Sequence, residues 1–265
     1  GYLTFYLSWR AVFWLNLPLG AVALITARKV LQGRGSAHRE HRIDYLKWDH
    51  NRDLTCAGGA DGRAAYRVQT DSAYALMDRL RAAHPQLEIE SCSGGGGRID
   101  FGVLRHAHRV WTSDCIDALS RVDIQRGFLQ FFPPEIMGAH IGASPAHTTG
   151  RSQSMGFRAA VALPGHLGVE LDARLLDEAT RAEVAHWIAL YKRWRDRLHH
   201  GRVWLGEAGD GLVWQAHGDA ERNELLLFVY RIQPSSHRYT PTLRLPMLDA
   251  SARYRACRVL PEGRH

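Results

Sequence analysis

Two aspartates stand where paired carboxylates could do acid–base chemistry. Asp49 lies in the segment 47–52 (KWDHNR), and Asp114 ends the segment 111–114 (WTSD). Each follows a short apolar stretch and has a tryptophan nearby. Hydrolysis of a glycosidic bond needs such a pair of carboxylates at the scissile bond, and an aromatic surface suits the apolar face of a sugar. The alternative is that Asp114 or Asp117 caps the helix predicted from residue 116.

A glycine run at residues 94–97 lies between these two segments. It matches neither G-x-x-x-x-G-K-[ST] nor G-x-G-x-x-G, so it gives little support for a phosphate cradle. Its other use is steric, because glycine lets backbone N–H groups approach a ligand closely.

The elements that must position these residues alternate along the chain. Hydrophobic periodicity predicts helices at residues 71–83, 116–131, 151–163 and 177–199. Short apolar stretches predict strands between them, at residues 43–48, 87–91, 109–112, 136–141 and 166–170. Alternation of this kind indicates a parallel sheet, here five of the eight units of a (β/α)8 barrel, whose chemistry lies after the strands.

The two ends of the chain differ from this central part. Residues 11–27 are almost continuously apolar and long enough for a short membrane span, and five basic residues follow against one acid within 28–42. The alternative for 11–27 is a buried helix. After residue 201, short strands at 203–205, 212–216, 225–230 and 243–245 indicate a small antiparallel β domain. We thus divide the chain into residues 1–42, 43–200 and 201–265.

Composition excludes several classes of protein. The net charge is +7, but more than half of it comes from residues 28–42, and the chain has only three lysines, so a nucleic-acid surface is not indicated. Four cysteines without a C-x-x-C pair indicate neither a disulfide scaffold nor a cysteine zinc site. Fifteen histidines make pairs such as His106-x-His108 expected by chance, so no metal site is predicted.

Three segments in order resemble glycoside hydrolase family 36, the bacterial α-galactosidases and related enzymes. They are residues 47–52 (KWDHNR), 90–100 (ESCSGGGGRID) and 111–125, which contains W-T-S-D-x-x-D-A-x-x-R-x-x-I-Q. Residues 137–142 (MGAHIG) fit as well, and the resemblance covers about residues 43–260. Separately, residues 1–31 resemble a transmembrane stretch of the drug:proton antiporters of the major facilitator superfamily.

The family 36 resemblance implies a fold and a set of roles. The fold would be strands four to eight of a TIM barrel followed by a small antiparallel β-sandwich. Asp49 would be the nucleophile and Asp114 the general acid/base of a retaining double displacement, with no metal or organic cofactor. The substrates would be α-galactosides of the raffinose or melibiose type. The residues implied to line or support the galactose pocket are Lys47, Trp48, Asn51, Cys92, Ser93, Gly94, Gly95, Arg98 and Trp111.

The sequence also departs from the family pattern. His50 stands where methionine is usual, and Cys115-Ile116 where Asn-Thr is usual. The W-x-x-D-D-G-W-like segment that holds the galactose hydroxyls is missing, as are the first three barrel strands, so we expect impaired activity. The alternatives are a transporter fragment, on residues 1–31 alone, or a sugar-binding remnant without turnover. The resemblance implies a cytoplasmic enzyme, oligomeric when complete, whereas residues 11–27 would imply a membrane.

Overall fold

The structure is a computed structural model that describes residues 43–51, 58–59, 62–219, 221 and 224–259. The chain divides into two compact units, residues 1–46 and 47–265. The apolar segment 11–27 and the antiporter-like stretch 1–31 lie outside the described residues. Among the helices that are described, none is long and apolar enough to cross a membrane.

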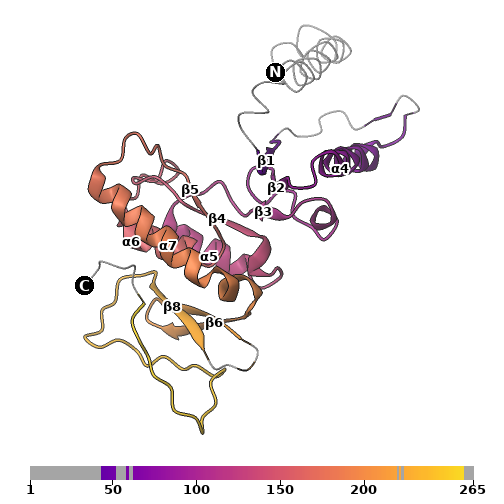
Figure 1. Ribbon diagram of the computed structural model, residues 1–265. Coiled ribbons are helices and arrows are strands. Elements are labelled where there is room, and N and C mark those ends of the chain that lie inside the picture. The colour runs from indigo at the N-terminus through magenta and orange to yellow at the C-terminus, as the bar shows by residue number, and fades with distance from the viewer. Residues whose placement is uncertain (1–42, 52–57, 60–61, 220, 222–223, 260–265) are drawn as a thin grey trace. The chain divides into compact units, whose positions relative to one another are not determined.

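Five strands form one sheet in sequence order, which confirms the incomplete (β/α)8 barrel (Figure 1). Its strands are β1 (Tyr45–Asp49), β2 (Glu88–Cys92), β3 (Arg109–Trp111), β4 (Met137–Ile141) and β5 (His166–Val169). The pairs β2–β3, β3–β4 and β4–β5 are parallel, with Trp111 opposite Gly138. The carboxyl ends of these strands therefore share one edge of the sheet, where a barrel carries its chemistry.

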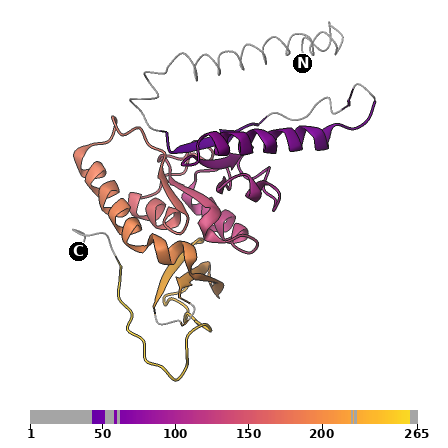
Figure 2. The same cartoon turned by 45° about the vertical axis from the view of Figure 1, so that its right-hand side comes forward.

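Helices follow most of these strands, as predicted. They are α4 (Tyr66–Ala83), α5 (Ala118–Phe128), α6 (Met155–Ala162) and α7 (Glu178–His200). The link from β2 to β3 contains only the 3-10 turn η1 (Val103–Arg105), and η2 (Pro134–Ile136) precedes β4. Helix α4, the long purple helix of Figure 2, follows β1 in the chain. Its Tyr74 ring stacks on the His106 ring of the β2–β3 link, with the ring centroids 4.3 Å apart.

Capping residues set where the helices begin. The Asp117 carboxylate accepts the Leu119 N–H at 2.9 Å and starts α5, so Asp117, and not Asp114, is the cap of this helix. Ser154 caps α6, which is why that helix begins later than the predicted residue 151. Helix α4 begins five residues before the predicted start. Asp114 is thereby left outside the helix and available for another role.

The main core lies between the sheet and the helices that cover it. Ala139 and Ile141 of β4 pack against α6 and α7, with Trp187 and Leu198 buried in the same cluster. Trp194 is partly buried against it, so both tryptophans of α7 serve packing. Burial of these side chains removes apolar area from water, which is the dominant stabilising term.

The C-terminal residues form an antiparallel sheet of β6 (Arg202–Gly209), β7 (Leu212–Gly218) and β8 (Leu225–Arg231). The prediction of a strand at residues 243–245 is wrong. Pro241 and Pro246 flank that segment and have no N–H to donate to a ladder. Leu243 and Leu245 instead pack against the cluster around Trp214. The described residues here form a single sheet where the resemblance implied a sandwich.

Candidate active site

The ends of β1, β2 and β3 carry most of the residues singled out in the sequence. Lys47 and Asp49 are two positions apart on β1, so their side chains lie on one face, and Trp48 lies on the other. Cys92 is the last residue of β2, and Trp111 the last of β3. Asp49 and Asp114 are both exposed at this edge of the sheet.

The glycine run joins the end of β1 to the end of β3. The Gly94 N–H donates to Asn51 Oδ1 at 2.5 Å, and the Gly96 N–H donates to the Thr112 carbonyl at 3.1 Å. Gly95 has φ +79°, and a Cβ there would come within 2.4 Å of the Ser113 Cα. Only glycine fits this position, so the run brings the segment before Asp114 close to Asn51.

Two predicted pocket residues support the end of β1. The Ser93 hydroxyl and Arg98 Nη2 donate to the same acceptor, the His50 carbonyl, at 2.8 and 2.7 Å. Cys92 completes this junction, because its carbonyl accepts the His50 N–H at 3.2 Å. These contacts fix the backbone directly after Asp49.

The Cys92 thiol is influenced by both aspartates. Its Sγ lies 3.9 Å from Asp114 Oδ1, and the Asp49 carboxylate contributes to the pKa of the thiol. The side chain is fully buried. Burial raises the pKa of Cys92 to about 11, and Asp49 raises it further while Lys47 opposes the rise. Cys92 is therefore a neutral thiol at pH 7.

Trp111 is a buried residue that supports the Lys47 side chain. Its ring is 2 % exposed, so it is a buried support and offers sugars no open face. Lys47 Nζ lies 4.8 Å from the ring centroid, and the His140 ring stacks on it at 4.1 Å. The ring thus holds the Lys47 ammonium by a cation–π contact.

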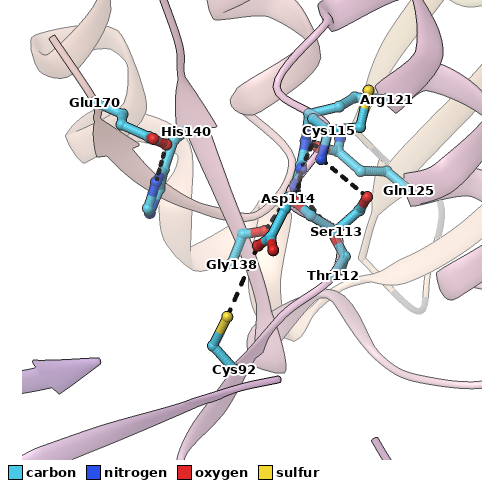
Figure 3. A network of polar contacts seen from close by, with 10 residues as sticks. All are labelled: Cys92, Thr112, Ser113, Asp114, Cys115, Arg121, Gln125, Gly138, His140 and Glu170. Atoms are coloured by element: carbon cyan, nitrogen blue, oxygen red, sulfur yellow. Dashed lines mark hydrogen bonds and ion pairs between the residues drawn. The ribbon is translucent and has the colours of Figure 1, made fainter. Parts of the chain in front are cut away.

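Sequence reasoning gave no role to His140, which lies on β4, or to Glu170, which directly follows β5. His140 Nδ1 is 3.2 Å from Glu170 Oε2 (Figure 3). This hydrogen bond is the main reason that the pKa of Glu170 is lowered, and Lys47 adds to the effect. His140 is next to last in the strand predicted at 136–141 and Glu170 ends the strand predicted at 166–170, and a position near a strand's carboxyl end was the signal that could have identified them.

Sequence reasoning also quoted Arg121 within a motif without giving it a role. The guanidinium is buried and lies 4.3 Å from the Trp111 ring centroid, on the far side of the Asp114 segment from Cys92 (Figure 3).

Among the described residues, no group of three or more His, Cys, Asp or Glu side chains is arranged to hold a metal ion.

The Melibiase family model matches residues 32–201. The chain belongs to the melibiase family. Among curated relatives, an α-galactosidase of Escherichia coli is 44 % identical over 218 residues, covering 82 % of this chain and 30 % of that protein. The α-galactosidase AgaA of Geobacillus stearothermophilus is 35 % identical over 221 residues, covering 80 % and 30 %. The chain thus spans less than a third of the length of these relatives.

Solved structures of melibiase relatives have the same fold. A variant of AgaA from Geobacillus stearothermophilus in complex with raffinose superposes with a TM-score of 0.72 at 34 % identity, covering 78 % of this chain and 30 % of that one. The galactosidase domain of the α-galactosidase–sucrose kinase AgaSK gives 0.71 at 33 % identity, covering 81 % and 30 %. These matches confirm the expected fold and family.

Proposed function

We propose that the edge formed by β1, β2 and β3 is the sugar site of a glycosidase that removes terminal α-linked galactose from oligosaccharides. The observation that carries the proposal is the position of the Cys92 thiol, whose Sγ lies 3.9 Å from Asp114 Oδ1 and whose pKa the Asp49 carboxylate raises. Both carboxylates thus act on one thiol, and glycoside hydrolysis needs a pair of carboxylates close together. Relatives of the chain are α-galactosidases, and structures of two AgaA variants contain raffinose and stachyose.

In the proposed mechanism Asp49 attacks the anomeric carbon while Asp114 donates its proton to the leaving oxygen. The glycosidic bond breaks and an Asp49–galactosyl ester forms. Asp114, now ionised, takes a proton from water, whose oxygen attacks the same carbon and releases Asp49 and galactose with retained configuration. Lys47, on the same face of β1 as Asp49, supplies donors for sugar hydroxyls. The two carboxylates account for both steps, so no cofactor is invoked.

The proposal includes slow turnover by residues 1–265 alone. The five described strands form an open sheet, whereas the pocket of a (β/α)8 barrel is built from all eight loops at its carboxyl face. Sugar hydroxyls that face the open side meet no partner from the described strands. We expect kcat/KM on p-nitrophenyl α-galactoside to be far below that of a complete melibiase assayed in parallel.

Covalent labelling tests the site even when turnover is slow. A galactose-configured cyclophellitol aziridine alkylates the nucleophile of a retaining α-galactosidase, and peptide mass spectrometry locates the label. We expect the label on Asp49, and none in Asp49→Asn. With residual turnover, Asp49→Asn lowers kcat by roughly a thousandfold or more, and proton NMR shows α-galactose as the first product.

Asp44→Asn serves as the matched control, because Asp44 precedes β1 and is exposed. It should label and turn over as the unmodified chain does. A label on any residue other than Asp49, or β-galactose as the first product, contradicts the proposed mechanism. Galactose binding by calorimetry with neither label nor turnover would instead favour the sugar-binding remnant.

A further inference from the structure

Arg121 of α5 directs three of its hydrogen bonds to the residues around Asp114. Its Nη1 donates to the carbonyls of Ser113 and Cys115, at 2.9 and 3.1 Å. These are the residues directly before and after Asp114 (Figure 3). Nη2 donates to Thr112 Oγ1 at 2.7 Å, so one planar group holds the two residues before Asp114 and the residue after it.

The same guanidinium is itself fixed in place from two sides. Nη2 also donates to the Gly138 carbonyl of β4 at 3.3 Å, and Nε donates to Gln125 Oε1 at 3.1 Å. Gln125 in turn donates to the Val161 carbonyl of α6 at 2.7 Å. The side chain of Arg121 is 2 % exposed. The segment 112–115 is therefore tied to α5, α6 and β4 through a rigid fork.

We propose that Arg121 is a positioning residue that sets the direction of the Asp114 carboxylate by clamping the carbonyls on both sides of it. The inference rests on the proposed function of Asp114. A catalytic group must be held within a fraction of an ångström of its reacting partner. Segment 112–115 follows β3 without regular secondary structure, so the sheet alone does not fix it.

A role in packing alone would not explain this arrangement. The oxygens that accept hydrogen bonds from Arg121 are neutral carbonyl, hydroxyl and amide oxygens. Burial lowers the pKa of Arg121 to about 10, so the side chain is still a cation at pH 7. Keeping this cation away from water has a desolvation cost. Filling the same volume needs only an apolar side chain. Lysine keeps the charge but has no planar fork and cannot hold two carbonyls and a hydroxyl in one plane.

The test compares Arg121→Lys with Arg126→Lys in the full chain. Arg126 is on the same helix, is 12 % exposed, and also donates to two carbonyls, those of Gly206 and Trp214. These belong to the C-terminal sheet and not to the Asp114 segment. Both variants lose a guanidinium that holds backbone carbonyls and is at least largely buried, so a general effect of losing such a group would appear in both.

The first measurement is amide hydrogen exchange, which does not depend on turnover. We expect Arg121→Lys to speed exchange in a peptide covering residues 112–117 about tenfold or more, with β2 unchanged. Arg126→Lys should leave residues 112–117 as they were. Unchanged exchange in 112–117 for Arg121→Lys, or an equal rise in both variants, overturns the clamp.

The second measurement separates positioning of the acid from a general loss of activity. A 2,4-dinitrophenyl leaving group needs no proton, whereas methyl α-galactoside does. Acid catalysis contributes about 10²–10⁴-fold, so Arg121→Lys should lose at least tenfold more activity on the methyl galactoside, and Arg126→Lys should lose equally on both. Equal losses for Arg121→Lys overturn the proposal. The labelling experiment tells failure of the clamp apart from failure of the proposed function. If the proposed function is wrong, Asp49 stays unlabelled even in the unmodified chain.

Discussion

Cys92 Sγ lies 3.9 Å from Asp114 Oδ1, and the Asp49 carboxylate raises the pKa of the same thiol, so both carboxylates act on one sulfur atom. A thiolate at this point would be repelled by both of them. The high pKa of the thiol, about 11, keeps it neutral across the physiological range. In the proposed mechanism this neutral thiol takes no part in bond making.

We predict that Cys92 is the slowest of the described cysteines to react with iodoacetamide. Only the thiolate reacts, and the pKa of about 11 leaves little of it at pH 8. Its rate should continue to rise up to about pH 11, whereas exposed Cys257 should react fast at pH 8. Peptide mass spectrometry after timed alkylation measures both rates. Labelling of Cys92 as fast as Cys257 at pH 8 would show that the thiol is not buried between the aspartates.

Gly95→Ala should destabilise the chain and displace the Asp114 segment. A methyl group there comes within 2.4 Å of the Ser113 Cα, and the φ of +79° adds strain of about 1–2 kcal/mol. Urea unfolding should give a total loss above about 2 kcal/mol. The matched control is Gly127→Ala inside α5, where no atom lies within 4 Å of the added Cβ. It should stabilise the chain by about 0.5–1 kcal/mol. Equal effects of the two substitutions would contradict the close approach.

Most of the fold could be predicted from the sequence because each element carries its own signal. Alternating apolar stretches gave the sheet order, and Ser154 and Asp177 mark where α6 and α7 begin. The strand predicted at 243–245 failed because alternation of leucines also suits an extended segment that packs without pairing. Local pattern does not distinguish the two cases unless the flanking prolines are taken into account.

Only the residues that lie in recognisable motifs of the sequence could be predicted for the candidate site. Asp49 and Asp114 follow strands, so their shared edge was foreseeable. The contact through Cys92 was not, because it depends on a positive φ at Gly95 and on the distance between loops. Arg121 stayed without a role because three of its five acceptors are backbone carbonyls, which leave no trace in residue identity.

Asp117→Ala should cost more stability than Asp177→Ala, although both residues cap helices. The Asp117 carboxylate is buried and also accepts from Thr149 Oγ1 at 2.7 Å and Arg151 Nη1 at 2.6 Å, which hold the loop after β4. We expect a loss of about 3 kcal/mol or more, because its partners lose a buried anion. The exposed cap Asp177 should cost about 1 kcal/mol. Urea titrations of both variants at pH 7 make the comparison, and equal losses would show that the loop does not depend on Asp117.

The chain should lose stability as the pH falls from about 6.5 to about 4. Burial lowers the pKa of His166 and of His217 to about 4, whereas both titrate near 6.5 when unfolded. Across this window the unfolded state binds protons that the folded state excludes. The free energy of unfolding therefore decreases as the pH is lowered, by up to about 1.4 kcal/mol per pH unit for each histidine. His217 Nδ1 donates to the Leu198 carbonyl at 3.0 Å, which leaves Nε2 unprotonated beside Gln215.

His217→Gln isolates one of these two contributions. The variant should be less stable at pH 7 by about 1–3 kcal/mol, because it disturbs a buried hydrogen bond. Its free energy of unfolding should nevertheless fall less steeply between pH 6.5 and 4.5, since one proton-binding difference is gone. His186→Gln, at an exposed position of α7, should keep the slope of the unmodified chain. Urea titrations at half-unit pH steps measure the three slopes. A slope that is the same in His217→Gln and the unmodified chain would mean that His217 is protonated in the folded protein.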